Sequence, residues 1–578
     1  MKDSTSTSVR SATRICATLV AFAALPALAA TTFELDGNIV SNGATDWASL
    51  FTAGDATTPP TTVAPLPTGI QTASFFRDFI PGSTADMSTF TTGSKDIHNI
   101  SGGGRDSGEW QCATSNNLSS KGDIVDAYAA IEIDGTTAWL VFGSERSSNK
   151  GTAKTSFWFL QDPSVACSGE GGTTTFSGNH VDGDLLIVAD FDGGGNVTTI
   201  QAFRWMGGAD GYLNPTPVGT GNDCVNGGST ANFCATVNRT ASLAYPDDVP
   251  WYIETKAGNT LEPRTFFEGR LNLSYYNLLK CFNRYMANTR QSTSITSTMF
   301  DYVIGDFEAC SLGVGKTCTA AAIGSNGQNV SYTWSVTVEN TGFATVYNVG
   351  LKDLPNLGTC TIDGTDYSSF VQIASTLAAG GKVTKTVQCS KLGLGQSNTV
   401  YVRAKSDPAM TIYDINDSYT AAHDGLGSTC SLTVTSTLGL NKACDEITLS
   451  PATTGVKINV KSNITLTNTG TEALSSVVIA DEDADGNAVP LVQTDSSFAT
   501  CTTATCEAFT GNMAPGQSFY FSSEFVPQSV DGDVTDPCNA EFSNTVSASG
   551  TGWITGSAVG ATPDSEACKL CDCAASGP

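Results

Sequence analysis

Two related stretches decide the fold of this chain: ENTGFATVYNVGLKD at residues 339–353 and TNTGTEALSSVVIADED at residues 467–483. Each follows a run in which apolar and polar residues alternate. Each then turns at Asn-Thr-Gly and continues into a second alternating run that ends in acidic residues. Alternation with a period of two indicates a half-buried β-strand, and a Gly-containing turn between two such runs predicts a hairpin. The sequence therefore predicts two copies of one β-rich module in tandem.

The similarity between the two copies extends beyond the hairpins. ACSLGVGKTC at residues 309–318 parallels TCSLTVTSTLGLNKAC at 429–444, and SNTVYVRAKS at 397–406 parallels SNTVSASGTG at 543–552. The spacing between equivalent positions grows along the chain, which insertions in loops explain. About seven short strands in each copy are typical of an immunoglobulin-like sandwich.

An unrepeated module precedes the two copies. In AYAAIEIDGTTAWLVFGSE at residues 127–145, two alternating runs flank Asp134-Gly135, and a type I′ hairpin turn favours this pair because both central positions have positive φ. Tyr275–Met286 has apolar residues at a 3.6 period and predicts a short helix. We expect an all-β protein, in which an N-terminal β-sandwich of jelly-roll type is followed by two immunoglobulin-like β-sandwich repeats.

The expected division of the chain has five parts. Residues 1–29 are predicted to be a secretory signal, because positive residues precede an apolar run of about eleven residues and a small-residue cleavage pattern. That run is too short to span a bilayer, which needs ~20 apolar residues. The other predicted parts are the N-terminal sandwich (30–309), repeat 1 (310–425), repeat 2 (429–552) and a cysteine-containing tail (553–578).

The composition of the chain limits the classes of molecule that it could bind. The formal net charge is −27, which excludes nucleic acid as a partner because its phosphates require Lys and Arg. Charged residues make up 15% of the chain and Gly is abundant at 58 residues, which favours strands and turns over helices. No segment after the signal is apolar enough to cross a membrane. We therefore expect a secreted or cell-surface protein with an extracellular protein or glycan as partner.

The cysteines predict disulfides. The chain has 18 cysteines, and removal of the signal with Cys16 leaves an odd number, so one thiol is free or bonded to another chain. In an exported protein so many cysteines indicate an oxidising compartment. The tail motif Cys568-x-x-Cys571-x-Cys573 fits either zinc or disulfides, and the compartment favours disulfides. The pairings that we expect are Cys224–Cys234, Cys318–Cys389 and Cys444–Cys538.

SVTVENTG at residues 335–342 and NITLTNTG at 463–470 resemble a bacterial surface repeat known as domain of unknown function eleven. That family is an immunoglobulin-like or transthyretin-like module, found in tandem on secreted proteins. The first module resembles the uncharacterised domain that precedes such repeats in large secreted bacterial proteins. The segments that carry this second resemblance are FELDGNIV (33–40), GSKDIHNIS (93–101), AYAAIEI (127–133), FGSERSSNKGTAKTSFWFLQ (142–161), GDLLIVADF (183–191), FFEGRLNL (266–273) and ANTRQS (287–292). Both resemblances imply fold and export, and neither implies an activity.

One segment suggests a metal. Asp481, Asp483 and Asp485 alternate before Gly486, which matches the opening of a calcium loop, and carboxylate oxygens suit Ca²⁺. The match ends at Val492, where a bidentate Glu is required. The alternative is an acidic turn between two strands. No other cofactor is expected.

A sugar platform is a second hypothesis. Exposed Trp rings stack on sugar rings, and Trp110, Trp205 and Trp251 lie near polar, Gly-rich segments of the first module. Packing in a core is the alternative for each ring.

Catalysis has weak support in the sequence. The three histidines lie far apart, and no nucleophile, phosphate-loop or dinucleotide motif occurs in a suitable context. Acidic residues such as Asp126 and Glu145 could form the carboxyl pair of a glycosidase, as in any acidic protein. We expect a non-enzymatic structural or adhesion protein, with the repeats as spacer and the first module as head. The alternative is a carbohydrate-binding protein with a glycan site in the N-terminal sandwich.

Overall fold

The structure is a computed structural model of the 578-residue chain. It describes residues 33–570 except 84–87, 92, 103–107, 115–117, 152–153, 169–171, 192–196, 225–230, 356–358, 393–396, 423–431, 452, 454–455, 502–505 and 528–540. The predicted signal at 1–29 lies outside the described residues, as do Cys538, Cys571 and Cys573.

The N-terminal part of the chain is a 15-stranded ladder with an additional two-stranded pair, β13-β14. The ladder runs β1-β4-β5-β15-β12-β11-β9-β8-β6-β16-β17-β2-β3-β7, and β10 pairs with β9. The strands are β1 (Ile70–Arg77), β2 (Thr89–Phe90), β3 (Gln111–Ala113), β4 (Ile124–Asp134), β5 (Thr137–Arg146), β6 (Lys154–Leu160), β7 (Thr174–Thr175), β8 (Leu185–Phe191), β9 (Val197–Met206), β10 (Tyr212–Leu213), β11 (Gly219–Asp223), β12 (Phe233–Val237), β13 (Leu243–Ala244), β14 (Thr260–Leu261), β15 (Phe266–Asn272), β16 (Arg284–Arg290) and β17 (Met299–Asp306).

The ladder folds over itself into a sandwich, because alternate residues of its central strands share one core. Phe142 on β5 lies against Phe159 on β6 with ring centroids 6.1 Å apart, and Phe157 stacks on Phe267 at 5.4 Å. These rings belong to one buried cluster that joins both halves. The intervening Trp158 faces the opposite way and is also buried. The strands are therefore buried on both faces, which explains their nearly continuous apolar runs.

Loops cover the two outer faces of this sandwich. Residues 33–51 and 243–261 cover the face of β4 and β5, where Trp47 and Trp251 pack around Tyr128. Loop residues such as Ile100 and Phe176 cover the face of β6 and β8, where Trp110 packs against Trp158. Each covering layer contributes large aromatic side chains. Alternation within the strands does not predict that these loop side chains are buried.

The predicted helix at Tyr275–Met286 is wrong. Residues 273–277 form turns with Asn277 at a φ of 55°, and β16 begins at Arg284. Leu278 and Phe282 are nevertheless buried, so their apolar character reflects packing of an extended segment beside the Cys281–Cys310 disulfide. Among the residues that the structure describes, α1 (Trp47–Leu50) and the 3₁₀ turn η1 (Gly208–Asp210) are helical segments, and Cys224 is helical as well.

The next part of the chain forms two sheets, β18-β19-β24-β21-β22 and β23-β20-β25-β26. Their strands are β18 (Leu312–Ile323), β19 (Val330–Asn340), β20 (Val346–Pro355), β21 (Thr359–Ile362), β22 (Thr365–Asp366), β23 (Val371–Leu377), β24 (Lys382–Leu392), β25 (Ser397–Lys405) and β26 (Ile415–Ala422). Strand β19 is buried at every second residue, as alternation predicts. We call this pair of sheets the first sandwich.

The last part also forms two sheets, β27-β28-β32-β31 and β30-β29-β33-β34, with β35 paired to β33. We call it the second sandwich. Its strands are β27 (Leu438–Pro451), β28 (Val456–Asn468), β29 (Leu474–Asp483), β30 (Ala488–Val489), β31 (Leu491–Thr494), β32 (Ser518–Phe525), β33 (Glu541–Gly552), β34 (Ala558–Gly560) and β35 (Asp564–Lys569). All three parts are thus all-β sandwiches.

Residues 553–570 are not a separate tail. Strand β35 pairs with β33 from Glu541↔Lys569 to Val546↔Asp564, and Cys568 is bonded to Cys444 on β27. The expected boundary at 552 is therefore wrong, because the edge of the last sheet is completed by a strand beyond it.

The Asn-Thr-Gly turns have the same internal structure in both sandwiches. Asn340 is fully buried; its amide nitrogen donates to the oxygen atoms of Ala344 (2.7 Å) and Leu377 (2.8 Å), and its Oδ1 accepts from Gly342 N. Asn468 does the same with Glu472 O, Met513 O and Gly470 N. The side chain replaces hydrogen bonds that the bent main chain cannot make, so Asn is required there.

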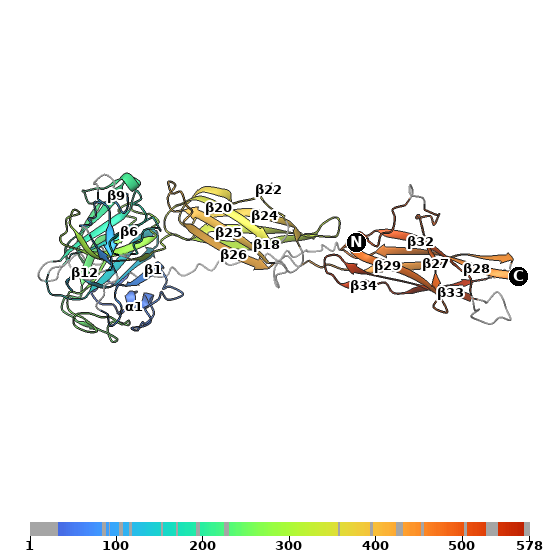
Figure 1. Cartoon of the computed structure of the whole chain (residues 1–578), viewed down its shortest axis with the longest axis horizontal. Helices are drawn as coiled ribbons and strands as arrows, with labels where there is room; N and C mark the ends of the chain where they lie inside the picture. Colours follow the sequence, from blue (N-terminus) through green and yellow to red (C-terminus); the bar gives the residue numbers. More distant parts are fainter. Residues whose placement is uncertain are drawn as a thin grey trace, which may run out of the picture.

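The three parts lie in a line, with the N-terminal sandwich at one end (Figure 1). One buried cluster continues from the N-terminal sandwich through Phe307 and Cys310 into the first sandwich. At the other junction, Ala473 N donates to Gly327 O over 2.8 Å. No helix among the described residues is both long and apolar enough to cross a membrane.

Candidate functional site

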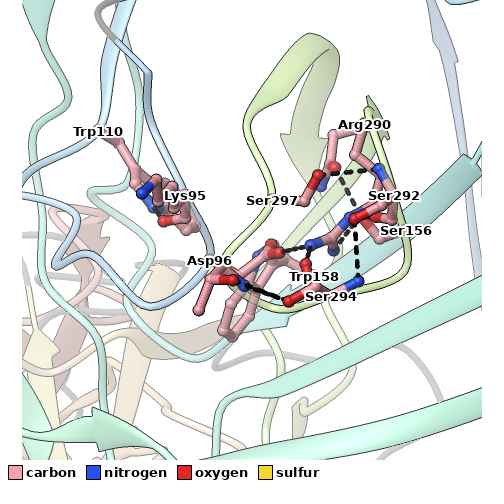
Figure 2. A network of polar contacts seen from close by, with 11 residues as sticks. Lys95, Asp96, Trp110, Ser156, Trp158, Arg290, Ser292, Ser294 and Ser297 are labelled. Carbon is pink, nitrogen blue, oxygen red and sulfur yellow. Dashed lines mark hydrogen bonds and ion pairs between the residues drawn. The ribbon is translucent and has the colours of Figure 1, made fainter.

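A buried ion pair links a loop to the outer face of the N-terminal sandwich (Figure 2). The guanidinium of Arg290 on β16 pairs with Asp96, and both side chains are fully buried. Arg290 also donates to Ser292 O over 2.8 Å, and the Asp96 carboxylate accepts from Trp158 Nε1 over 2.9 Å. Because several polar groups surround both charges, this network holds the loop at 292–297 and leaves no open face for a ligand.

His180 lies next to this network. Its Nδ1 is 3.0 Å from Asp184 Oδ2, and its ring stacks on Trp205 with centroids 3.9 Å apart. Trp158 and Trp110 flank the other sides. Burial lowers the pKa of His180 despite the nearby carboxylate of Asp184, so the imidazole is neutral at pH 7. A neutral ring enclosed by three indoles serves packing, because no substrate reaches it.

A pair of carboxyl groups is buried under the opposite outer face. Glu145 Oε1 accepts from Tyr128 Oη (3.1 Å) and from Trp251 Nε1 (3.3 Å). Asp126 lies beside Glu145, and Arg77 Nε is 3.7 Å from Asp126 Oδ1. Burial raises the pKa of both groups, that of Glu145 to about 7, and the proximity of the two carboxyls raises that of Asp126 further. The pair therefore retains a proton at neutral pH.

Such a pair has the acid and base that glycoside hydrolysis needs, but substrate access is missing. Asp126 and Glu145 are both fully buried. The cavity that borders Glu145 has a volume of about 20 Å³. This is room for about one water molecule and too little for a sugar ring. The two carboxyl groups therefore act on the stability of the fold and not on a substrate. Because they keep a proton at neutral pH, the free energy of unfolding depends on pH.

The predicted sugar platform is wrong at all three positions. Trp110, Trp205 and Trp251 each have an exposed fraction of 0%. Their ring nitrogens donate inward, from Trp110 to Lys95 O (3.0 Å) and from Trp205 to Gly208 O (2.7 Å). The covering loops fold over these rings, so their Gly-rich flanks indicate close packing of loops and not exposure.

The predicted calcium site does not assemble. The Asp481 carboxylate lies inside the second sandwich, where Lys442 Nζ donates to it over 2.6 Å. Asp483 Oδ1 instead accepts from Asp485 N (3.0 Å) and Asn487 N (2.8 Å) in an exposed turn. One carboxylate is neutralised by a buried ammonium and the next closes a turn, so the alternative of an acidic turn is the better description.

Buried Lys–Asp pairs occupy the same place in both repeats. Lys316 Nζ donates to both oxygens of Asp353 at 2.9 Å, and Lys442 pairs with Asp481; all four side chains are fully buried. Burial lowers the pKa of both lysines, and the paired carboxylate opposes this shift. Our sequence reasoning missed these pairs. The sequence pattern that could have revealed them is a lysine two residues before a cysteine in the first strand of each repeat, Lys316 before Cys318 and Lys442 before Cys444. Each repeat also has acidic residues at the end of its Asn-Thr-Gly hairpin.

The disulfides differ in part from the expected pairings. Cys224 is bonded to Cys234, the pairing expected from the sequence. Cys389 is bonded to Cys360, because β21 and β24 pair with these residues opposite each other, so the expected Cys318–Cys389 bond is wrong. Cys444 is bonded to Cys568 and not to Cys538. The structure also has the bonds Cys112–Cys167, Cys281–Cys310 and Cys501–Cys506.

One set of residues has the spacing of a metal site. Ligand atoms of Asp353, Cys360 and Cys389 lie within 4.8 Å of one another. The two sulfur atoms are bonded to each other and the carboxylate is paired with Lys316, so these atoms are not available to a metal ion.

No protein-family model matches the chain, and no curated protein matches it. Among solved structures, the chain is similar to an exo-chitosanase of Amycolatopsis orientalis at 14% identity over 41% of this chain, with a TM-score of 0.12. It spans a quarter of the length of that enzyme, 25%. Four tandem repeats from the extending region of a large adhesion protein match at 14% identity over 75% of this chain and 96% of theirs, with a TM-score of 0.20. Chicken CNTN1 FN1–FN3 domains match at 6% identity over 66% of this chain and 97% of theirs, with a TM-score of 0.11. Scores this low carry no argument about function.

Proposed function

We propose that this chain is an exported structural protein of the cell surface or the extracellular medium, active in adhesion or matrix contact. Residues 30–309 form its head, and the sandwiches at 310–425 and 429–570 form a spacer. The observation that carries this proposal is the linear arrangement of three sandwiches with bonded junctions (Figure 1). Such an arrangement sets the distance between its two ends, which is the physical property that a spacer supplies.

The junction between head and spacer supports a fixed orientation. The Cys281–Cys310 disulfide ties the segment before β16 of the head to the residues that precede β18 of the first sandwich. Gln71 Nε2 donates to Thr341 O over 2.7 Å, and Asn283 Nδ2 donates to Asp414 Oδ2 over 2.9 Å. Because these two hydrogen bonds come from separate parts of the head, the first sandwich cannot rotate about one of them without breaking the other.

The junction between the two sandwiches has a different construction. The hairpin tip at Gly327, between β18 and β19, lies against Ala473 and Pro515 of the second sandwich. Leu432 and Ile554 pack on the core of the first sandwich. We place the bending point of the spacer at this contact.

The interior of the head supports a role in recognition through its surface. The buried carboxyl pair, the Arg290–Asp96 network and the His180 cage all lie in the interior of the head, away from its surface. A partner, an extracellular protein or a glycan, would meet the loops outside these networks. The disulfides support an oxidising location.

Localisation tests this proposal directly. Antibodies to the full chain should label intact, unpermeabilised cells or detect the protein in the medium, with the residues before position 30 removed. The cysteines of the recovered protein should resist alkylation until it is reduced. Recovery only from the cell interior, with cysteines that react before reduction, would contradict export and with it the proposed role.

A further inference from the structure

Positively charged side chains meet at one end of the interior of the N-terminal sandwich. Arg146 ends β5, Lys154 begins β6, and Arg264 lies two residues before β15. All three residues line one small cavity. Strands β5 and β15 are neighbours in the ladder, whereas β6 lies in the other half of the sandwich, so the cavity lies between the two halves. Its inner wall includes Ile124 and Phe267, which belong to the shared core.

The carboxyl group next to Arg146 in the sequence does not neutralise this arginine. Side chains alternate along β5, and Arg146 lies on the same face as Phe142 of the shared core. Glu145 lies on the other face, where its carboxyl group accepts from Tyr128 and Trp251. The guanidinium and this carboxyl group therefore point to opposite sides of the sheet.

Arg146 is half-buried, and its partners among the described residues are main-chain oxygens. Its Nε and Nη2 atoms both donate to Arg264 O, over 3.0 Å and 2.7 Å, and Nη1 donates to Gly151 O over 3.4 Å. Burial and the neighbouring Arg264 lower the pKa of Arg146 to about 10. A charged side chain that is withdrawn from water is normally paired with an opposite charge. A bound anion would supply the opposite charge that Arg146 lacks here.

Two lysines add to the positive charge of this region. Lys121 reaches Gly151, where an added Cβ atom would lie 3.8 Å from the lysine Nζ. Lys154 forms an ion pair with Asp190. Together with the two arginines, four cations lie close to one cavity in a chain whose formal net charge is −27. This region therefore attracts anions, although the chain as a whole repels them.

From this geometry we propose that the cavity and its cationic rim bind the sulfate or carboxylate group of an acidic glycan. The cavity volume of about 20 Å³ accommodates one oxygen atom of such a group and leaves the sugar ring outside. Arginine suits this contact, because its planar guanidinium matches the geometry of an oxyanion.

Several cations around one opening favour a glycan over an acidic peptide. Sugar rings hold their charged groups at fixed intervals, so neighbouring cations can each meet a charge with little loss of conformational freedom. Acidic side chains of a peptide lose more rotamer entropy on binding. The proposal rests on the proposed function, because it names the class of partner that the head would recognise.

Binding of the full-length chain to immobilised polymers tests the proposal. Dextran sulfate carries sulfate groups, polygalacturonate carries carboxylate groups, and dextran is the uncharged control. We expect retention on at least one of the two charged glycans and none on dextran. Retention on neither charged glycan, or equal retention on dextran, would overturn the proposal. Polyglutamate bound as tightly as the glycans would also overturn it, because the site would then recognise acidic peptides.

Substitutions show whether binding occurs at this cavity. Arg146→Gln should weaken binding to the retained glycan at least tenfold. If that variant fails to fold, Arg264→Asn should cause the same loss, because Arg264 is exposed and asparagine tolerates its positive φ of 71°. The matched control is Arg204→Gln, which removes the same charge from an ion pair with Asp182 elsewhere in the head and should change binding less than twofold.

Equal losses in the Arg146 and Arg204 variants would contradict the proposal, because net charge and not this cavity would then decide binding. Such a result would leave the export of the chain unaffected. Failure of the glycan site is therefore distinguishable from failure of the proposed function, which the localisation experiment measures.

Discussion

Asn340 Nδ2 donates a hydrogen bond of 2.8 Å to the main-chain oxygen of Leu377, across the end of the first sandwich. The same amide group donates to Ala344 O, so one side chain joins the turn to the start of β20 and the end of β23. The second sandwich has the equivalent residue, Asn468. The repeated Asn-Thr-Gly motif is thus explained by an amide that satisfies main-chain atoms at a bend in the chain.

Replacement of this amide should therefore destabilise one sandwich selectively. Asn340→Ala leaves the buried oxygens of Ala344 and Leu377 without these donors, which should cost about 3 kcal/mol. Hydrogen exchange should accelerate in β20 and β23 and stay unchanged in the second sandwich. The control is Asn416→Ala, at an exposed position of β26. Equal protection in the two variants would show that the amide network is unimportant.

The buried carboxyl pair predicts a pH dependence of stability. The pKa of Glu145 rises from 4.5 to about 7 on folding because of burial. Between these values the folded state binds more protons than the unfolded state, so the free energy of unfolding decreases as the pH rises. One such group contributes on the order of 1 kcal/mol per pH unit. The melting temperature of the head should be higher at pH 5 than at pH 8.

Glu145→Gln provides the check, because glutamine retains the Oε1 acceptor for Tyr128 and Trp251 but does not titrate. This variant should lose part of the decrease between pH 5 and pH 8. Asp247→Asn, at an exposed position, should keep the full decrease. If the wild-type head melted at the same temperature across this range, the retained proton would be disproved.

The buried indoles predict a loss of stability and not of sugar binding. Trp205→Ala removes a fully buried ring that stacks on His180, which should cost about 3–5 kcal/mol. Urea unfolding of the full chain should show an earlier transition for the head. Trp553→Ala is the control, since that ring is 47% exposed. Unchanged unfolding of the Trp205 variant would mean that the ring is not in the core.

The junction between the two sandwiches depends on a glycine. A Cβ atom at Gly327 would lie 2.5 Å from Ala473 N, so Gly327→Ala should separate the hairpin tip from the second sandwich. Gly364→Ala is a matched control, because Gly364 also has positive φ but its added Cβ meets no atom within 4 Å. Energy transfer between one dye in each sandwich should give a broader distance distribution for Gly327→Ala alone. Identical distributions would refute the proposed contact.

The sequence was sufficient for the all-β fold, since that information is local. Alternation within strands such as β19 and the hairpin between β4 and β5 follow from short-range rules. The turn itself differs from the prediction, because Asp134 pairs with Thr137 and the two central residues are Gly135 and Thr136. The helix expected near Leu278 failed because tertiary packing of an extended segment can produce the same apolar spacing.

The sites were harder to predict because they combine residues distant in sequence. Trp205 is buried by loops from elsewhere in the chain, and Asp481 meets a lysine 39 positions earlier. Cys444 is bonded to Cys568, which lies on a strand beyond the expected boundary at residue 552. Sequence patterns supply the residue types, but the register of the strands decides which side chains meet.

Small-angle X-ray scattering of the mature chain is the most direct test of the account, because the central claim is a line of three sandwiches with bonded junctions. The account predicts the pair-distance distribution of a rod with one swollen end, unchanged on dilution, and a longer tail or broader spread only when the Gly327 contact is broken. A compact particle, or the profile of freely jointed bodies in the unaltered chain, would contradict the proposed spacer.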